Sequence, residues 1–451
     1  MASLARAGVR GLCTRPARAH AERAVTLASS EAEALVPAVL HRLRTWTDDH
    51  ILLFALSKSL PRAALSSLVS HITQSVPPHA RVGMLAPALP PALVPDARAS
   101  KPVHAAALAA VPAKDAVTFR STIRGAPRIA VGRWTAQKDL WKRGMELRAD
   151  GLDRTGEWTS LWGRENAEEH VPASLASLRA DQIDAMLVCT DPRPEGLWEG
   201  LDARFPHAHL IGATAALTPF ETGREHTMLG ADIYEEGAVG LAWRRPTSHL
   251  VRTFGGLVPL GPRLVVTGAR GNIVSSLNDH NAAQQFLHLV LQRRAAPRDH
   301  LDAAQLRALS SDVRRDDDFF LGLYATETDP VPCLVARIQA GHPVRGTLGL
   351  ETETELEGLA QYAQVFRAKP HDDVLTDTPC AAHAGVQYVW ASENAAPAHV
   401  PPLAAPVMAR GVWTWEHTFL AGAESSWFAR TPGTRTHACA VPQSSVVLHR
   451  S

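Results

Sequence analysis

Apolar positions in the first part of the chain switch between helical spacing and short continuous runs. Residues 31–45 (EAEALVPAVLHRLRT) carry apolar side chains three and four positions apart, which predicts an amphipathic helix. The run at 51–56 (ILLFAL) predicts a buried strand. A proline-bounded helix is predicted at 63–76 and a second strand at 80–85. Strand, helix and strand in this order indicate an α/β unit.

The same order recurs in the middle of the chain. Residues 184–189 have the pattern of a buried strand, 194–204 that of a helix, and 207–212 that of a second strand. The two units suggest related halves of one α/β layer. Two unrelated units are the alternative, because such units are common in α/β proteins.

The rest of the chain favours short strands over helices. A polar, tryptophan-bearing segment at 137–166 predicts a long surface insertion, a helix is predicted at 355–366, and the aromatic run at 412–419 predicts an added strand or edge hairpin. Further strands are predicted at 106–110, 116–123, 128–131, 316–323, 333–338 and 344–350. We therefore expect a mixed α/β fold with layered sheets and flanking helices.

Composition and charge exclude several classes of partner. The 451 residues suit two domains, and 45% apolar with 20% charged residues is typical of a soluble globular protein. A formal net charge of +1 favours neither nucleic acid nor an anionic membrane. No run approaches the roughly 20 apolar residues of a membrane span. The five cysteines are widely separated, so they predict neither a disulfide framework nor a zinc finger.

One ordered block between residues 185 and 290 carries a family resemblance. It reads AMLVCTDPRPEGLWEGLDARFPHAHLIGATAALTP, then EEGAVGLAW, and then GGLVPLGPRLVVTGARGNIVSSLNDHNAAQQFLHLV. In this order and spacing the block resembles a FIST protein, whose name joins F-box and intracellular signal transduction. Asn278 and Asn281 depart from the family pattern, which would place Asp and Pro there.

The resemblance implies a domain division and a role. It implies a FIST N-terminal domain at 31–250 and a FIST C-terminal domain at 251–395. The parts of the chain outside these domains are a leader at 1–30 and a C-terminal extension at 396–451. Such domains are proposed to bind small molecules, including amino acids, and to pass the signal to an attached output domain. We therefore expect a sensory or scaffold protein that binds a small-molecule ligand, with no F-box for ubiquitin-ligase assembly.

The densest polar cluster beside a predicted strand end is the loop ETGREHT at 221–227. Arg224 could clamp a carboxylate with its guanidinium fork, Glu225 could accept hydrogen bonds from an ammonium group, and His226 could change charge near neutral pH. These are the groups that an amino-acid site needs. A solvated loop in which Arg and Glu pair locally is the alternative.

Three further residues are candidates for ligand binding. Thr214 ends a predicted strand of an α/β unit, where open sheets often bind ligands, although it could equally cap the turn. Gly271 and Asn272 form a turn after the apolar strand at 264–267. Gly271, with Gly268, suits a positive φ angle, whereas the amide of Asn272 could bind a ligand carboxylate or simply stabilise the turn.

Neither a catalytic residue nor a cofactor is predicted. The turn TGARGN lacks the further glycine of a dinucleotide loop, and no tyrosine stands four residues before a lysine, as a short-chain dehydrogenase requires. No nucleophile elbow, H-E-x-x-H helix or P-loop occurs. The pairs His207 with His209 and Cys380 with His383 lack further ligands, so we expect no metal.

Two other functions stay open at this point. The first is an uncharacterised enzyme with its active site between the two FIST units. The second is a protein-interaction module in which Trp413, Trp415 and Trp427 form an aromatic surface, although tryptophan more often packs in a core.

The first residues predict a mitochondrial matrix location. Arg6, Arg10, Arg15 and Arg18 precede the first acidic residue, Glu22, as in mitochondrial transit peptides. A cytoplasmic protein with a basic N-terminus is the alternative. We expect a fluorescent reporter fused to residues 1–30 to enter mitochondria, and replacement of the four arginines by glutamine to prevent entry. A diffuse cytosolic signal from the unaltered fusion contradicts the prediction.

Overall fold

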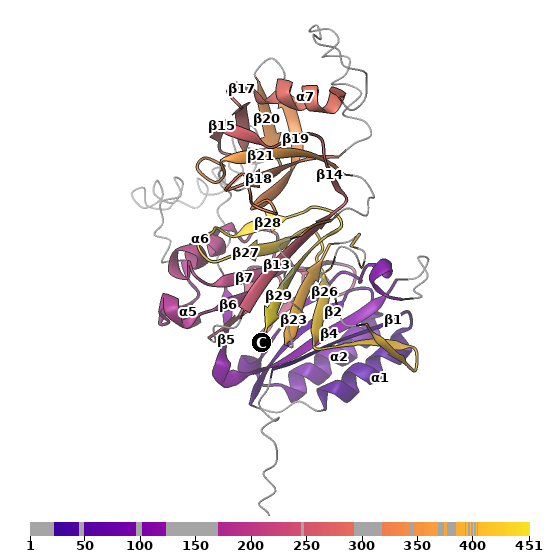
Figure 1. Ribbon diagram of the computed structural model, residues 1–451. Coiled ribbons are helices and arrows are strands. Elements are labelled where there is room, and N and C mark those ends of the chain that lie inside the picture. The colour runs from indigo at the N-terminus through magenta and orange to yellow at the C-terminus, as the bar shows by residue number, and fades with distance from the viewer. Residues whose placement is uncertain are drawn as a thin grey trace, which may run out of the picture.

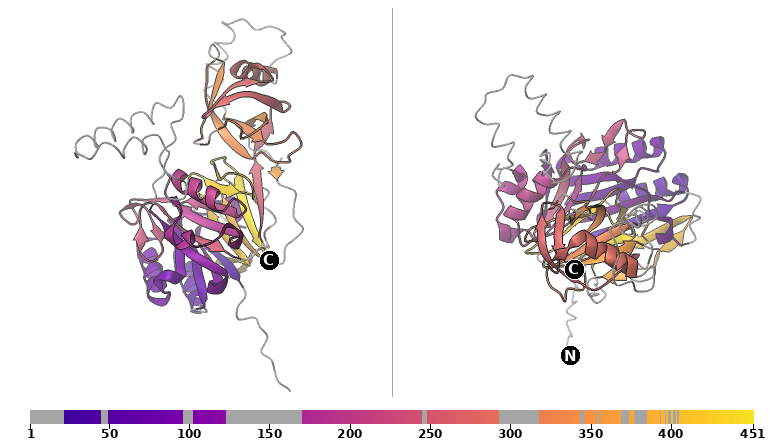
Figure 2. Two further views of the ribbon diagram at one scale, coloured as in Figure 1. Left: turned by 90° about the vertical axis from the view of Figure 1, so that its left-hand side faces the viewer. Right: turned by 90° about the horizontal axis from the view of Figure 1, so that it is seen from above.

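The computed structural model describes most of the chain. The described residues are 22–44, 49–95, 102–122, 170–244, 248–292, 318–342, 346–352, 354, 356–368, 374–376, 385–392, 394–395, 397, 400, 403 and 405–451. Within them, three sheets form the lower part of the molecule in Figure 1, called the body here. A β-barrel lies above the body in the same view. Figure 2 shows the same arrangement from the side and from above. No described helix has the length and apolar character that a membrane crossing requires.

Three sheets make up the body. In spatial order, the first sheet contains β11 (Ile233–Tyr234), β10 (Met228–Leu229), β3 (Arg81–Ala86), β2 (His50–Ser57), β4 (His104–Pro112), β1 (Arg23–Ser29), β25 (Val412–Glu416) and β24 (Val407–Ala409). The second contains β28 (His437–Cys439), β27 (Trp427–Arg430), β7 (His209–Thr214), β6 (Ala185–Thr190), β12 (Ala238–Trp243) and β5 (Ala116–Ser121). The third contains β22 (Val374–Thr376), β13 (Ser248–Gly255), β29 (Ser444–Arg450), β23 (Val386–Ala391) and β26 (Thr418–Gly422).

The first and second sheets share one core and carry helices on their outer faces. In β2, Leu53 belongs to the shared core and Phe54 to the layer under the helices; in β6, Leu187 and Val188 alternate in the same way. Strands buried on both faces must be apolar throughout, which is why these runs could be recognised in the sequence. The helices of the body are α1 (Ala32–Leu43), α2 (Arg62–Ser75), α5 (Ala173–Ala176) and α6 (Glu195–Arg204), with 3₁₀ turns at Pro78–Ala80, Pro91–Leu93, Ala113–Asp115 and Ala180–Gln182.

The barrel closes because its first and last strands pair. In ring order it contains β18 (Phe319–Tyr324), β21 (Tyr362–Ala368), β15 (Leu264–Arg270), β16 (Ile273–Leu277), β20 (Thr347–Leu350) and β19 (Leu334–His342), with β14 (Leu257–Pro259) beside β21 and β17 (His280–Asn281) beside β16. Helix α7 (Ala282–Gln292) lies at the end of the barrel away from the body (Figure 1). Its apolar side chains, including Phe286 and Leu287, pack into the barrel core.

Most predicted elements agree with the structure, but three predictions are wrong. Residues 23–29, placed in the leader, form the buried strand β1 between β4 and β25. The helix predicted at 355–366 is replaced from Tyr362 onward by β21, whose pairing with β18 closes the barrel. The two α/β units lie in two facing sheets and not in one layer.

The aromatic run at 412–419 was predicted as an added strand or edge hairpin, and β25 does form an antiparallel hairpin with β24 at the edge of the first sheet. The run is, however, not a single element. It divides into β25 and β26, which belong to different sheets, with His417 at a φ of 58° between them. Trp415 and Trp427 are buried and pack in the core, so they do not form the aromatic interaction surface considered as one alternative. The strand predicted at 128–131, the insertion at 137–166, Cys380, His383 and residues 1–21 lie outside the described residues. The domain boundaries at 250 and 395 stay a prediction.

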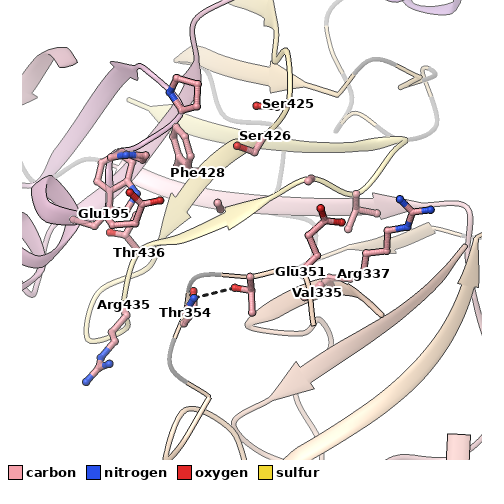
Figure 3. A pocket seen from close by; sticks show the side chains of 18 of the residues that line it. Glu195, Val335, Arg337, Glu351, Thr354, Ser425, Ser426, Phe428, Arg435 and Thr436 are labelled. Carbon is pink, nitrogen blue, oxygen red and sulfur yellow. Dashed lines mark hydrogen bonds between the residues drawn. The ribbon is translucent and has the colours of Figure 1, made fainter. Parts of the chain in front are cut away.

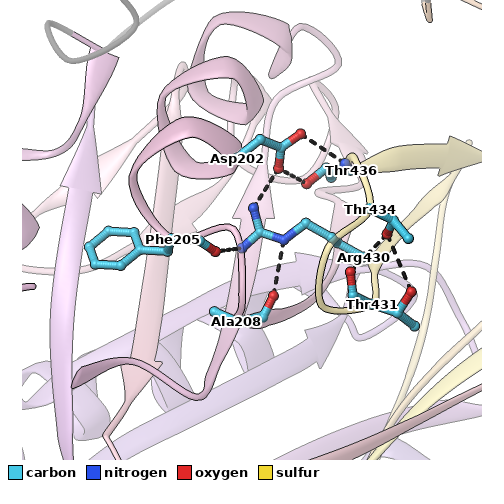
Figure 4. A network of polar contacts seen from close by, with 7 residues as sticks. All are labelled: Asp202, Phe205, Ala208, Arg430, Thr431, Thr434 and Thr436. Carbon is cyan, nitrogen blue, oxygen red and sulfur yellow. Dashed lines mark hydrogen bonds and ion pairs between the residues drawn. The ribbon is translucent and has the colours of Figure 1, made fainter. Parts of the chain in front are cut away.

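Arg430, a buried arginine in β27, hydrogen-bonds residues at the end of α6 (Figure 4). The Arg430 side chain is fully buried; it donates to the Phe205 and Ala208 carbonyls at 2.9 and 3.0 Å and pairs with Asp202 at 2.5 Å. The same carboxylate accepts the backbone N–H and the hydroxyl of Thr436. A cation that satisfies carbonyls at a helix C-terminus stabilises that end.

We expect Arg430→Met to destabilise the protein by about 3–5 kcal/mol, because the substitution leaves a largely buried carboxylate and two carbonyls without their donor. Urea denaturation measures the change. Arg435→Met is the matched control, since Arg435 is exposed in the same hairpin, and should change the free energy of unfolding by less than about 0.5 kcal/mol. Equal effects of the two substitutions would show that the Arg430 contacts contribute nothing.

A second buried group makes stability depend on pH. Burial lowers the pKa of His437 in β28 to about 4, and the charges of Arg252 and Arg435 act in the same direction. Neither ring nitrogen of His437 has a hydrogen-bond partner among the described residues. At a pH below the usual histidine pKa of about 6.5, the unfolded chain binds a proton at this residue that the folded protein does not bind. The free energy of unfolding therefore decreases as the pH is lowered.

From this difference in pKa, the His437 contribution to the free energy of unfolding should fall by about 2.5 kcal/mol between pH 7.5 and pH 4.5. Urea denaturation at both pH values, with His437→Phe for comparison, measures it. The variant should lose less stability on acidification than the unaltered protein. Identical losses in the two proteins would rule out His437 as the cause.

Candidate functional site

A cavity of about 370 Å³ lies where α6, the β27–β28 hairpin and the barrel meet (Figure 3). Its lining residues include Glu195, Trp198, Glu199 and Asp202 from α6; Ser425, Ser426, Phe428, Arg435, Thr436 and Ala438 from the hairpin and the segment before it; and Phe320, Val335, Arg337, Glu351, Thr352 and Thr354 from the barrel. The cavity therefore joins three parts of the chain that are far apart in sequence.

The loop after β6 positions the polar end of this cavity. Asp191 is buried, and its carboxylate accepts the backbone N–H of Arg193 at 2.8 Å and that of Gly237 at 2.6 Å. Gly237 has a φ of +80°, and a Cβ there would lie 2.3 Å from the Ser121 carbonyl oxygen, so only glycine fits. The loop held in this way leads through Pro194 into α6, which begins at Glu195.

Glu195 is the chemically distinctive residue of the cavity. Its Oε2 atom is buried and has no hydrogen-bond partner among the described residues. Burial raises the pKa of the Glu195 carboxyl group, and the nearby Asp191 and Glu199 carboxylates raise it further. A buried acceptor without a donor costs free energy, which a ligand that donates a hydrogen bond would recover.

Aromatic and apolar side chains form the wall beside Glu195. The rings of Trp198 and Phe428 lie 4.9 Å apart at an interplanar angle of 56°. Phe320 and Val335 of the barrel also line the cavity. A mainly apolar wall with a few polar groups is typical of small-molecule sites, and aromatic faces also attract cations.

The charges of the lining favour a cation over an anion. Arg337 pairs with Asp318, and Asp202 pairs with Arg430, so each of these charges is compensated. Glu195 and Glu351 face a single further cation in the described lining, Arg435. Arg435 is exposed and extends away from Glu195 (Figure 3). The remaining potential is therefore negative near Glu195.

Thr214 lies next to this cavity, but the other predicted site residues lie elsewhere. Thr214 is buried at the end of β7, and its hydroxyl lies 3.3 Å from that of Ser426 in the cavity wall. Gly271 and Asn272 form the β15–β16 turn of the barrel. Gly271 has a φ of +58°, and Asn272 donates to the Leu350 carbonyl at 2.9 Å. Gly268 lies instead in β15, at a register shift.

The predicted loop at 221–227 contains β9 (Arg224–His226), which pairs with β8 (Leu217–Thr218) in a two-stranded ribbon. Arg224 lines a separate cavity of about 180 Å³ beside α2. Glu225 is exposed, and its backbone N–H donates to Glu235 at 2.9 Å. His226 is buried, and its Nδ1 lies 2.9 Å from the Ala215 carbonyl oxygen. The structure thus separates the side chains that we expected to form one site.

The prediction from sequence missed Glu195 and Trp198. A signal for them existed, because an acid directly after a proline and three residues before a tryptophan opens a helix at the end of an apolar strand. The carboxyl end of a parallel strand is where open sheets bind ligands. Among the described residues, no group of three or more His, Cys, Asp or Glu side chains could hold a metal ion.

Residues 103–280 match the family described as the FIST N domain. The match begins at the start of β4 and ends at β17, so it contains β6, α6 and β7 and reaches the first hairpin of the barrel. FIST domains are sensory domains of signal transduction, so the match supports a sensory or signalling role in coarse terms. No curated protein matches the chain significantly. The FIST C-terminal domain expected at 251–395 stays a prediction.

Proposed function

We propose that the protein is a FIST-type sensor whose ligand binds in the cavity at Glu195 and is a small metabolite with an ammonium group, such as an amino acid. This proposal rests on the buried Oε2 atom of Glu195, which accepts no hydrogen bond from the described residues. An ammonium group supplies both the missing hydrogen bond and the opposite charge. The faces of Trp198 and Phe428 add cation–π attraction or apolar contact.

The place of the cavity suits a sensor. Glu195 and Trp198 belong to the matched FIST N region, whereas Val335 and Thr352 belong to strands or loops of the barrel beyond it. A ligand in this cavity contacts both parts at once. Its binding free energy can therefore favour one arrangement of the barrel relative to the body, which is what a sensory protein needs for signalling.

Catalysis in the same cavity is the second candidate function. One observation favours it: burial raises the pKa of Glu195, and a carboxyl group with a raised pKa suits general acid–base catalysis near neutral pH. Turnover distinguishes the two functions, because a sensor releases its ligand unchanged. A mitochondrial matrix location remains our proposal for the site of action.

We expect a thermal-shift screen of amino acids and simple amines to find a stabilising ligand, and Glu195→Gln to weaken its binding roughly 10- to 100-fold. The loss of a charge-assisted hydrogen bond of about 1.5–3 kcal/mol gives this range. Isothermal titration calorimetry at pH 7.5 measures it. Affinity for the unaltered protein should fall as the pH is lowered, because protonation of Glu195 removes its charge.

Glu225→Gln is the matched control, since Glu225 is exposed and lies outside the cavity. This variant should bind the ligand as the unaltered protein does. Unchanged affinity in Glu195→Gln contradicts the proposed site. Chemical conversion of the ligand, followed by mass spectrometry, would favour the enzyme.

A further inference from the structure

The first and second sheets are built to the same plan. The order β11-β10-β3-β2-β4-β1 in the first sheet corresponds to β28-β27-β7-β6-β12-β5 in the second. In each, one pair is parallel, β2 with β3 and β6 with β7, and the other neighbours in these series are antiparallel. Helices α2 and α6 connect the parallel strands.

The correspondence extends to individual residue pairs. Both parallel pairs begin and end at equivalent residues, and the flanking strands keep the same register on both sides. The equivalent positions include Arg23 and Ala116, Leu52 and Ala185, Arg81 and His209, Met84 and Gly212, Ala110 and Trp243, and Met228 and Phe428. Four strands follow one another in the same chain order and register in both sheets, β1-β2-β3-β4 and β5-β6-β7-β12, which indicates an internal duplication. β10 and β27, from elsewhere in the chain, extend the two sheets in the same register.

The duplication relates the two cavities to each other. Helix α6 turns Glu195, Trp198, Glu199 and Asp202 toward the larger cavity. Helix α2 also begins directly after a proline, and its Arg62, Leu65, Ser66 and Val69 line the smaller cavity. These residues have the same spacing from the first residue of α2 as Glu195, Trp198, Glu199 and Asp202 have from the first residue of α6. Each cavity is also bounded by the equivalent hairpin, β27–β28 in one and β10–β11 in the other.

The charge at the equivalent position is reversed. Arg62 of α2 stands where α6 carries Glu195. Arg224 is the second cation of the smaller cavity, and in the described part of the chain neither guanidinium group has a hydrogen bond or an ion pair. Glu221 lines the same cavity, and its Oε2 atom is buried without a donor from the described residues.

We infer that the cavity beside α2 is a second ligand site, for a small organic carboxylate that also carries a hydrogen-bond donor. Arg62 and Arg224 bind the carboxylate, for which the guanidinium fork is well shaped. The donor, a hydroxyl or ammonium group next to the carboxylate, satisfies Glu221. The Glu221 carboxylate disfavours a doubly charged anion such as phosphate.

Apolar side chains complete this second site. Leu65, Val69 and Leu229 line the cavity, so a short hydrocarbon part of the ligand can be buried there. The hydroxyl groups of Thr222 and Thr227 lie 2.9 Å apart in its wall, and both are hydrogen-bonded within the ribbon. This inference does not depend on ligand binding at Glu195, because no residue lines both cavities.

Isothermal titration calorimetry of the full chain with L-lactate, propionate and inorganic phosphate tests the inference. We expect lactate to bind more tightly than propionate, which lacks the donor, and more tightly than phosphate. Arg224→Gln and Arg62→Gln should each weaken lactate binding at least tenfold. Arg244→Gln is the matched control, since Arg244 is exposed and lies outside this cavity, and it should bind lactate normally.

Three results would overturn the inference. They are no lactate binding to the unaltered protein, equal affinity in Arg224→Gln and Arg244→Gln, and tighter binding of phosphate than of lactate. Thermal denaturation of each variant in the absence of ligand checks that it is folded. The amine ligand of the Glu195 cavity is titrated separately, so a failure at one site is distinguishable from a failure at the other.

Discussion

The last strands of the chain complete all three sheets of the body, and the rest of the fold depends on this pairing. β25 lies against β1 in the first sheet, β27 against β7 in the second, and β29 between β13 and β23 in the third. A buried hydrogen bond of 2.8 Å from Thr26 to the Thr418 carbonyl joins residues 392 positions apart. Without this segment, each sheet would expose unpaired backbone groups of a central strand.

The pairing of these C-terminal strands with all three sheets also positions residues of the candidate site. Ser425 and Ser426, in the segment between β26 and β27, line the cavity, and the Ser426 carbonyl accepts the backbone N–H of Thr214 at 3.2 Å. Glu424, directly before them, pairs with Lys58 of the first half at 2.6 Å. The chain end thus contacts both halves of the body and contributes residues to the cavity wall.

The two sheets that share a strand plan, the first and the second, bury the same feature with different residues. Each has a buried arginine near the C-terminus of its helix: Arg81 donates to the carbonyls of Thr73, in the last turn of α2, and of Val76, directly after it. Arg430 donates to the Phe205 carbonyl directly after α6. Arg81 belongs to β3, whereas Arg430 belongs to β27. The cavities diverge in a similar way, because Arg62 and Glu195 occupy one position with opposite charges. A common framework has therefore acquired two distinct polar surfaces.

The sequence by itself determined the local elements, and only the tertiary structure decided their partners and the site. The apolar runs at 51–56 and 185–190 predicted strands because a strand buried on both faces excludes polar residues. β1 and β21 were not recognised: the first follows an arginine-rich start, and the second has helix-like spacing before it. Arg224 and Glu225 are adjacent in sequence, yet neighbours in a strand point to opposite faces. Glu195, Val335 and Ser426 meet only through long-range pairing, so no local pattern could reveal their cavity.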